Sequence, residues 1–159
     1  MVILGIDPGS QATGYGIITK ENAAIKLLET GTVKPRSTET LHHRINTVYS
    51  NVKAIIEQFR PDILVLEKLY AHYKHPATAS TIAHVRGVIC LLCAQENISL
   101  AEHSVKRIRK AVTGNGNATK LQTRRMVAHL LNINENKLTL DASDALALAL
   151  GHAQMHRLI

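Results

Sequence analysis

Four acidic side chains occupy positions from which a fold could bring them into one site. Asp7 follows the apolar run of residues 2–6, and Glu67 ends a second short apolar run. The carboxyl ends of central strands are where α/β sheets place their sites, so both acids fit such a position. Asp141 and Asp144 lie three residues apart in an Ala- and Leu-rich segment, and this spacing puts them on one face of a helix.

The chemistry of such a cluster follows from Coulomb repulsion. Two carboxylates about 4 Å apart repel by roughly 4 kcal/mol at an effective dielectric constant of about 20, so four of them need protons or cations. Oxygen ligands with no Cys or His nearby in the sequence favour Mg²⁺, with Mn²⁺ as a substitute, over Zn²⁺. Two such ions about 4 Å apart would activate a water and stabilise the leaving oxygen of a phosphodiester. The candidate catalytic and metal-binding residues are therefore Asp7, Glu67, Asp141 and Asp144.

Each acid also has a purely structural explanation. Asp7 could hydrogen-bond within its own Asp-Pro-Gly turn, and Glu67 could pair with Lys68. Asp141 could be the N-cap of the last helix, with Asp144 placed favourably against the helix dipole. Spacing alone leaves both explanations open.

The charge of the chain favours an anionic partner. Its 19 Lys and Arg residues exceed its 12 Asp and Glu residues, which gives a net charge of +7. Between His103 and Asn134 there is no acidic residue. Such a run is often only a pair of solvated helix faces, but the absence of compensating acids favours a phosphate-binding surface. The candidate phosphate-contacting residues in this run are Lys106, Arg107, Arg109, Lys110, Lys120, Arg124 and Arg125.

The order of elements predicts an α/β domain that spans residues 1–159. Three consecutive strands without an intervening helix indicate an antiparallel meander, and the later elements alternate between helix and strand. We expect an open mixed sheet with helices on its faces. The predicted strands are 2–6, 15–19, 25–33, 62–67 and 98–101, and the predicted helices are 41–59, capped at Ser37 or Thr38, 77–94, two short helices around 114–116, and 141–156.

Several features argue against other classes of protein. No run of 18 apolar residues and no basic leader is present, so we expect a soluble cytoplasmic protein that does not act at a membrane. Cys90 and Cys93 lie in an apolar run and are interpreted as packing residues. His152 and His156 lie one helical turn apart, where they are expected to cap a helix C-terminus in preference to binding a metal.

Motifs along almost the whole chain resemble the RuvC family of Holliday-junction resolvases, within the RNase H-like fold. The resemblance rests jointly on the opening Gly5–Ser10 and Thr13–Gly16 segments, on Leu66-Glu67, on the Gly-x-Gly-x-Ala-x-Lys segment of residues 114–120, and on the Asp-x-x-Asp of the last helix. It implies a mixed five-stranded sheet with three antiparallel N-terminal strands and helices on both faces.

The resemblance also implies a function. The four acids would hold two Mg²⁺ ions, and Lys120 and Arg109 would contact the DNA backbone. Tyr70, in the loop after Glu67, would stack on an unpaired base near the crossover. A homodimer would nick two strands of a four-way junction symmetrically, in recombination and repair, together with a branch-migration helicase complex.

Two other functions remain open from the residues. In a non-catalytic nucleic-acid-binding module, the basic segment would suffice and the acids would be structural. Asp7-Pro8-Gly9-Ser10 also resembles the first phosphate loop of actin-like kinases and ATPases, although those proteins need two such domains.

Overall fold

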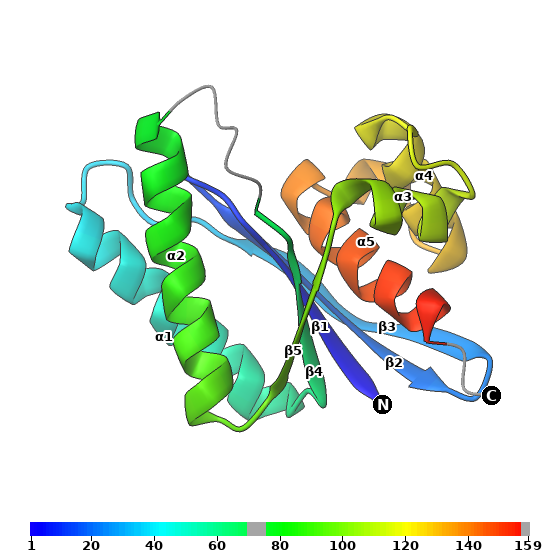
Figure 1. The fold of residues 1–159 in the computed structure, drawn as a ribbon, viewed down its shortest axis with the longest axis horizontal. Helices are drawn as coiled ribbons and strands as arrows, with labels where there is room; N and C mark the ends of the chain where they lie inside the picture. The colour runs from blue at the N-terminus through cyan, green and yellow to red at the C-terminus, as the bar shows by residue number, and fades with distance from the viewer. Residues whose placement is uncertain (70–75, 157–159) are drawn as a thin grey trace.

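A computed structural model describes residues 1–69 and 76–156 of the chain (Figure 1). Its elements, in chain order, are β1 (Val2–Pro8), β2 (Thr13–Glu21), β3 (Ala24–Val33), α1 (Leu41–Phe59), β4 (Ile63–Glu67), α2 (Pro76–Gln95), β5 (Ser99–His103), α3 (Val105–Thr113), α4 (Lys120–Leu130), the 3₁₀ turn η1 (Glu135–Lys137) and α5 (Leu140–Met155).

The five strands form one mixed sheet in the order β3-β2-β1-β4-β5. β1, β2 and β3 pair antiparallel as a meander, whereas β4 pairs parallel to both β1 and β5. The parallel pairs follow helical crossovers, α1 before β4 and α2 before β5, as parallel strands require. The predicted architecture, with three antiparallel N-terminal strands in a five-stranded mixed sheet, is confirmed.

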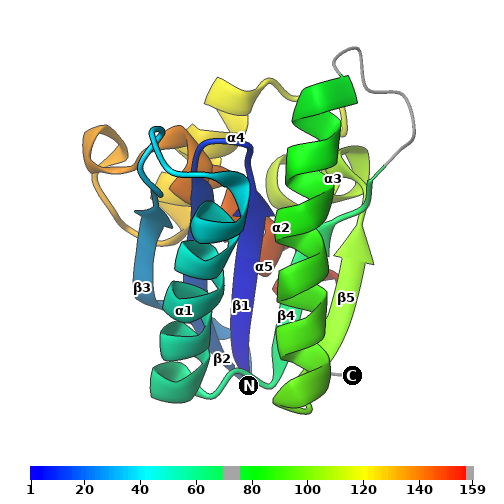
Figure 2. The same cartoon turned by 90° about the vertical axis from the view of Figure 1, so that its left-hand side faces the viewer.

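Helices cover both faces of the sheet (Figures 1 and 2). α1 and α2 pack on one face over a core that includes Leu4, Ile6 and Leu64. α5 crosses the other face, with α3 and α4 beside it, over a core that includes Ile3 and Val65. Because successive strand residues point to opposite faces, the same short strands supply both cores.

The last helix lies unusually close to the sheet because glycines line its path. A Cβ added at Gly5 would collide with the carbonyl oxygen of Ala145, and one added at Gly14 would collide with the carbonyl of Asp141. Both obstacles are backbone atoms of α5, so they cannot rotate away. Glycine in β1 and β2 therefore sets the height of α5 above the strands, and with it the position of the acids that α5 carries.

The helix caps differ in part from those predicted. α1 begins after Thr40, not after Ser37 or Thr38, and the Thr40 side chain makes no capping hydrogen bond. The apolar periodicity therefore located this helix without a strong cap. α5 is capped by Thr139, whose hydroxyl accepts a hydrogen bond from the backbone N–H of Ala142. The alternative in which Asp141 is the N-cap is thus wrong.

α2 is more apolar than its packing requires. By length and composition alone it could cross a membrane, a test that core helices also pass, although the sequence contains no unbroken apolar run of that length. Four of its side chains, Val85, Ile89, Leu92 and Cys93, are buried against the rest of the fold. Leu91 is 52% exposed, so part of the apolar surface of α2 faces outward.

Candidate active site

Three of the four predicted acids line one small hollow. Asp7 lies near the end of β1 and Glu67 ends the neighbouring parallel strand β4. Each follows by two residues a position that faces α5, namely Gly5 and Val65, so both point to the α5 side of the sheet. Asp144 reaches the same hollow, of about 80 Å³, from the first turns of α5.

The proximity of the acids and their burial shift the pKa values of two of them. Burial, followed by the charges of Asp144 and Glu67, raises the pKa of Asp7 to about 7. Burial and the charge of Asp144 also raise the pKa of Glu67. The free energy of ionising these carboxyls is therefore higher than in water, and a bound cation would lower it.

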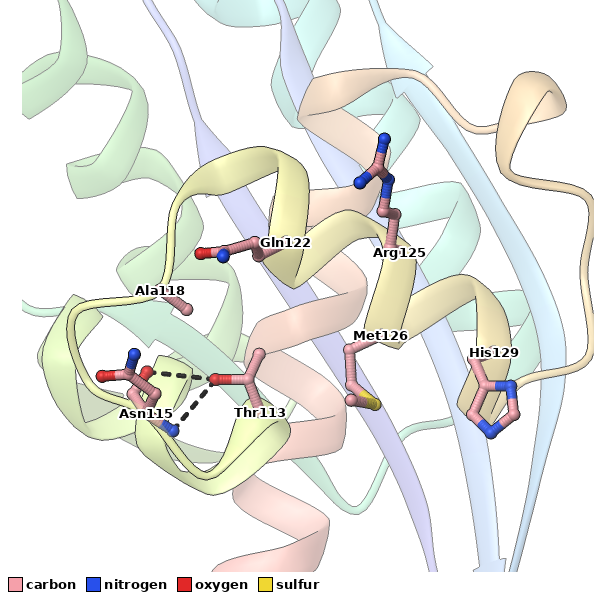
Figure 3. Close-up of a pocket in the computed structure, with 7 residues that line it drawn as sticks. All are labelled: Thr113, Asn115, Ala118, Gln122, Arg125, Met126 and His129. Atoms are coloured by element: carbon pink, nitrogen blue, oxygen red, sulfur yellow. Dashed lines mark hydrogen bonds between the residues drawn. The ribbon is translucent and has the colours of Figure 1, made fainter.

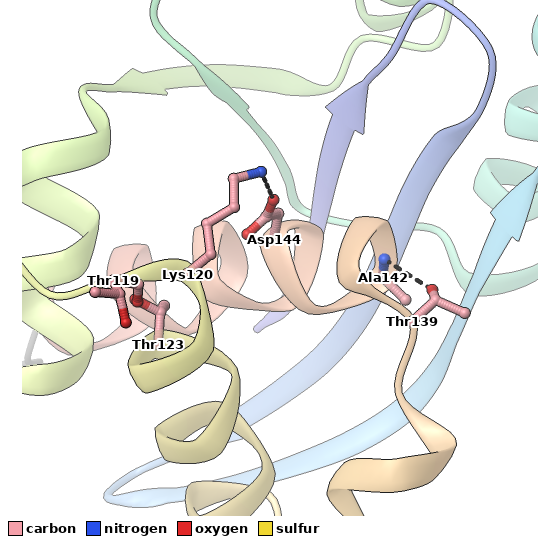
Figure 4. Close-up of polar contacts among 6 residues, drawn as sticks. All are labelled: Thr119, Lys120, Thr123, Thr139, Ala142 and Asp144. Carbon is pink, nitrogen blue, oxygen red and sulfur yellow. Dashed lines mark hydrogen bonds and ion pairs between the residues drawn. The ribbon is translucent and has the colours of Figure 1, made fainter.

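Lys120 supplies a positive charge within this cluster. Its Nζ lies 2.6 Å from Oδ2 of Asp144 (Figure 4). Burial lowers the pKa of Lys120, but the hydrogen bond to Asp144 and the charges of the acids outweigh it, so the pKa is raised overall. A capping box at Thr119 begins α4 and holds Lys120 at its first position. The ammonium group of Lys120 therefore lies among the carboxylates, where a metal cation would also bind.

Asp141 lies farther from the hollow than the other acids. It does not line the hollow, although its charge contributes to the raised pKa of Asp7. Its backbone carbonyl packs directly on Gly14, which is the register partner of Asp7 on β2. Asp141 is therefore at the border of the site, within electrostatic range of Asp7.

These residues fit a hard divalent cation. The hollow offers carboxylate oxygens from three elements and no Cys or His among its lining residues. Oxygen-only donors suit Mg²⁺ or Mn²⁺, and the ammonium of Lys120 already compensates part of their charge. The explanation that Glu67 pairs with Lys68 has no support, because among the described residues no ion pair joins them.

Arg86 supports this site but escaped the sequence analysis. Its guanidinium donates a hydrogen bond of 2.7 Å to the carbonyl oxygen of Glu67 and pairs with Glu102 on β5. It therefore holds the carboxyl ends of two neighbouring strands from α2. The available signal was a single Arg in a helix with no other Arg, Lys, Asp or Glu.

The basic residues divide into groups with different surroundings. Arg109 lines the hollow, and its charge lowers the pKa of Glu67. Lys106 and Lys110 are exposed on α3. Arg107 donates from Nε to Sδ of Met155 at the far end of α5. Tyr70 lies outside the described residues.

Arg124 and Arg125 turn toward η1. Arg124 donates a hydrogen bond of 2.6 Å to the carbonyl oxygen of Glu135, and Arg125 pairs with the Glu135 carboxylate at 3.7 Å. Glu135 lies just beyond the segment without acidic residues. The fold therefore places a carboxylate beside two arginines of that segment. Arg125 also borders a separate open pocket between α3 and α4, lined by Thr113, Asn115, Ala118, Gln122, Met126 and His129 (Figure 3). None of the four predicted acids lines this pocket.

Comparison with known proteins identifies the family of this chain. A family model described as crossover junction endodeoxyribonuclease RuvC matches residues 3–152. The chain belongs to this family. A RuvC from Rhodopirellula baltica is 37% identical over 151 residues, covering 94% of this chain and 85% of the relative. A RuvC from Caldicellulosiruptor saccharolyticus is 38% identical over 153 residues, covering 96% of this chain and 92% of the relative.

Solved structures give the same family. A structure of T. thermophilus RuvC in complex with a Holliday junction substrate has a TM-score of 0.91 and 26% identity, covering 99% of this chain and 96% of that one. The yeast mitochondrial Holliday junction resolvase shares the fold, with a TM-score of 0.68 and 17% identity, covering 98% of this chain and 81% of that one. The predicted RuvC resemblance and RNase H-like fold are confirmed.

The geometry explains the Gly-x-Gly-x-Ala-x-Lys segment of this RuvC chain. Gly114 ends α3 in the left-handed conformation at φ 79°, which glycine adopts readily. Gly116 packs close to the carbonyl of Lys106, and Ala118 is buried. The segment therefore folds tightly back on α3 and delivers Lys120 to the carboxylates at the start of α4.

Proposed function

We propose that this chain, as a single nuclease domain over residues 1–159, resolves four-way DNA junctions by Mg²⁺-dependent phosphodiester hydrolysis. The observation that carries the proposal is the convergence of Asp7, Glu67 and Asp144 beside Lys120 and Arg109, in a chain that matches RuvC endodeoxyribonucleases. T. thermophilus RuvC has been solved with a Holliday junction. That complex supports junction DNA as the substrate of this chain.

In this proposal the acidic side chains and the basic side chains have separate roles. Asp7, Glu67 and Asp144, with Asp141 at the border, would hold two Mg²⁺ ions, for which Mn²⁺ can substitute. When bound, these ions supply an activated water and stabilise charge on the leaving oxygen. Lys120 would then leave Asp144 and bind the phosphate backbone, and Arg109 would hold a neighbouring phosphate with its planar guanidinium.

We further propose that two copies of the chain act together. Symmetric nicks in two strands need two active sites, and the outward apolar surface of α2 around Leu91 offers a surface for a second copy. A branch-migration helicase complex is a second expected partner, by resemblance to the family. A cytoplasmic location fits these DNA-bound roles.

The experiment that tests the function is cleavage of a synthetic mobile four-way junction with Mg²⁺. Linear duplex and an RNA–DNA hybrid serve as substrate controls, and a chelator removes the metal. We expect paired nicks in the junction alone. Binding without metal-dependent cleavage would instead identify a non-catalytic nucleic-acid-binding module, and preferential cutting of the hybrid would identify an RNase H activity.

Junction affinity is expected to fall steeply with salt. Each neutralised phosphate contributes about −0.9 to the log–log slope on duplex DNA. Arg109→Ala and Lys120→Ala should each flatten the slope by about one unit if each side chain makes one phosphate contact. Fluorescence anisotropy at several salt concentrations measures this slope. An unchanged slope in both variants would assign these charges to the carboxylates alone.

Tyr70→Ala is expected to slow junction cleavage by about tenfold to a hundredfold, because base–aromatic stacking is typically worth ~1–3 kcal/mol. Tyr70→Phe should retain activity, since it keeps the ring. Single-turnover cleavage of the junction and of a substrate whose base is already unpaired measures the effect. If the alanine variant cuts at the wild-type rate, or if the phenylalanine variant is equally slow, Tyr70 does not act by stacking.

A further inference from the structure

Three histidines converge where the last turns of α5 meet the end of β5. His152 and His156 lie one turn apart in the last turns of α5, and His103 ends the edge strand β5. His152 follows Asp144 by eight residues, so about 12 Å of helix separates the two positions. His103 is the register partner of Glu67 on β4, but none of the three histidines is among the residues that line the carboxylate hollow.

The ring nitrogens are close enough to share one ion. Each histidine offers a nitrogen that lies within 4.8 Å of a nitrogen of the other two. Nε2 of His103 lies 2.9 Å from Nδ1 of His152, and the His152 and His156 ring centroids are 4.3 Å apart. His103 and His152 are buried while His156 is exposed, so the cluster is preorganised on one side and open to solvent on the other.

The backbone around the cluster is well anchored. Ser104, directly after His103, caps α3 by accepting a hydrogen bond from the N–H of Arg107. Lys20 on β2 donates from Nζ to the carbonyl oxygens of Ala153 and His156, at 2.5 and 2.6 Å. These contacts hold the positions of the histidines before any ion is bound.

The donor set selects the class of ion. Three imidazoles without a carboxylate suit Zn²⁺ and do not suit Mg²⁺, which prefers oxygen ligands. Burial lowers the pKa of His152 to about 4 and also lowers that of His103, so both are neutral at pH 7, as ligands must be. The charges of Lys20 and Arg107 oppose a cation here, but Lys20 is hydrogen-bonded to carbonyls at the negative end of the α5 dipole.

We propose that His103, His152 and His156 form a Zn²⁺ site with three protein ligands and an open fourth position. The ion would join the end of α5 to the edge strand β5. Because α5 also carries Asp141 and Asp144, the site would stabilise the helix on which half of the predicted acids lie. This inference does not depend on the proposed nuclease activity.

The experiment titrates metal-free full-length protein with Zn²⁺ in excess Mg²⁺, which occupies oxygen ligands. We expect one Zn²⁺ per chain by calorimetry and a rise in Tm of several degrees. His156→Ala should weaken Zn²⁺ binding at least tenfold and abolish the rise in Tm. His129→Ala, which removes an exposed histidine on α4, should change neither, and Asp7→Asn should bind Zn²⁺ as the wild type does.

Co²⁺ provides a second measurement on the unaltered chain. A four-coordinate site with nitrogen ligands gives Co²⁺ an intense visible absorption, which we expect for the wild type and which Zn²⁺ should displace. A weak six-coordinate spectrum, absence of Zn²⁺ binding, or equal binding by wild type and His156→Ala would overturn the proposal. The cluster would then be a hydrogen-bonded histidine pair beside an exposed third ring.

Discussion

Replacing Asp7 with asparagine should slow junction cleavage by about a thousandfold or more, a cost of about 4 kcal/mol in the activation free energy. The same change should stabilise the metal-free protein. Asn keeps the size of the side chain but removes a charge that lies among Glu67, Asp144 and Asp141. The variant therefore loses a metal ligand while it relieves repulsion in the fold.

The sign of the stability effect follows from the raised pKa. Burial and the neighbouring carboxylates raise the pKa of Asp7 from its ordinary value of 3.8 to about 7 in the folded chain. Between these pH values the folded state binds more protons than the unfolded state, so stability falls as pH rises from about 4 to 7. At pH 8 Asp7 is ionised in the folded wild type, so the wild type carries the full free-energy cost of that buried charge. Asp7→Asn should therefore be more stable by on the order of 2–4 kcal/mol.

Thermal unfolding at pH 5 and pH 8 with a chelator, together with single-turnover cleavage in Mg²⁺, measures both effects. The gain in Tm should be larger at pH 8, and added Mg²⁺ should stabilise the wild type more than the variant. Glu57→Gln on the exposed side of α1 is the matched control and should change neither cleavage nor this pH dependence. A variant that is destabilised at pH 8, or that cuts normally at limiting Mg²⁺, would contradict the assignment of Asp7.

The same cleavage experiment can rank the contributions of the other three acids. Glu67→Gln and Asp144→Asn should lose cleavage to a similar extent while they keep junction binding, because both line the hollow and neither belongs to the basic surface. Asp141→Asn should also lose most of its cleavage. Its effect is expected to be the smallest of the four, since Asp141 lies at the border of the hollow.

The sequence predicted the elements, and the proximity of three of the four acids, because both leave local signals. Apolar periodicity located α1, an Ala- and Leu-rich composition located α5, and the ends of two short apolar runs located Asp7 and Glu67 at one edge of the sheet. Three contacts join residues far apart in the sequence. Lys120 and Asp144 are 24 positions apart, and Arg86 and Glu67 are 19 positions apart. His103 is 49 positions from His152. No local pattern encodes such contacts, so the histidines at the end of α5 were interpreted as caps.

Gly14→Ala tests how the fold positions the acids and should reduce cleavage by about a hundredfold, the cost of a misplacement of about 1 Å. The added methyl group would collide with the backbone carbonyl of Asp141, so the first turn of α5 must move away from β2 and take Asp144 with it. Overpacking of this kind typically costs about 1–3 kcal/mol of stability.

A loss of stability alone must be separated from a displaced site. Val52→Ala provides the control, because Val52 is fully buried on α1 on the opposite face of the sheet and its truncation should cost a similar free energy. Per folded molecule, well below the melting temperature, Val52→Ala should cut junctions at the wild-type rate while Gly14→Ala does not. Equal cleavage by the two variants would show that the close approach of α5 to β2 serves packing alone; a hundredfold difference would assign to Gly14 the placement of the carboxylates on α5.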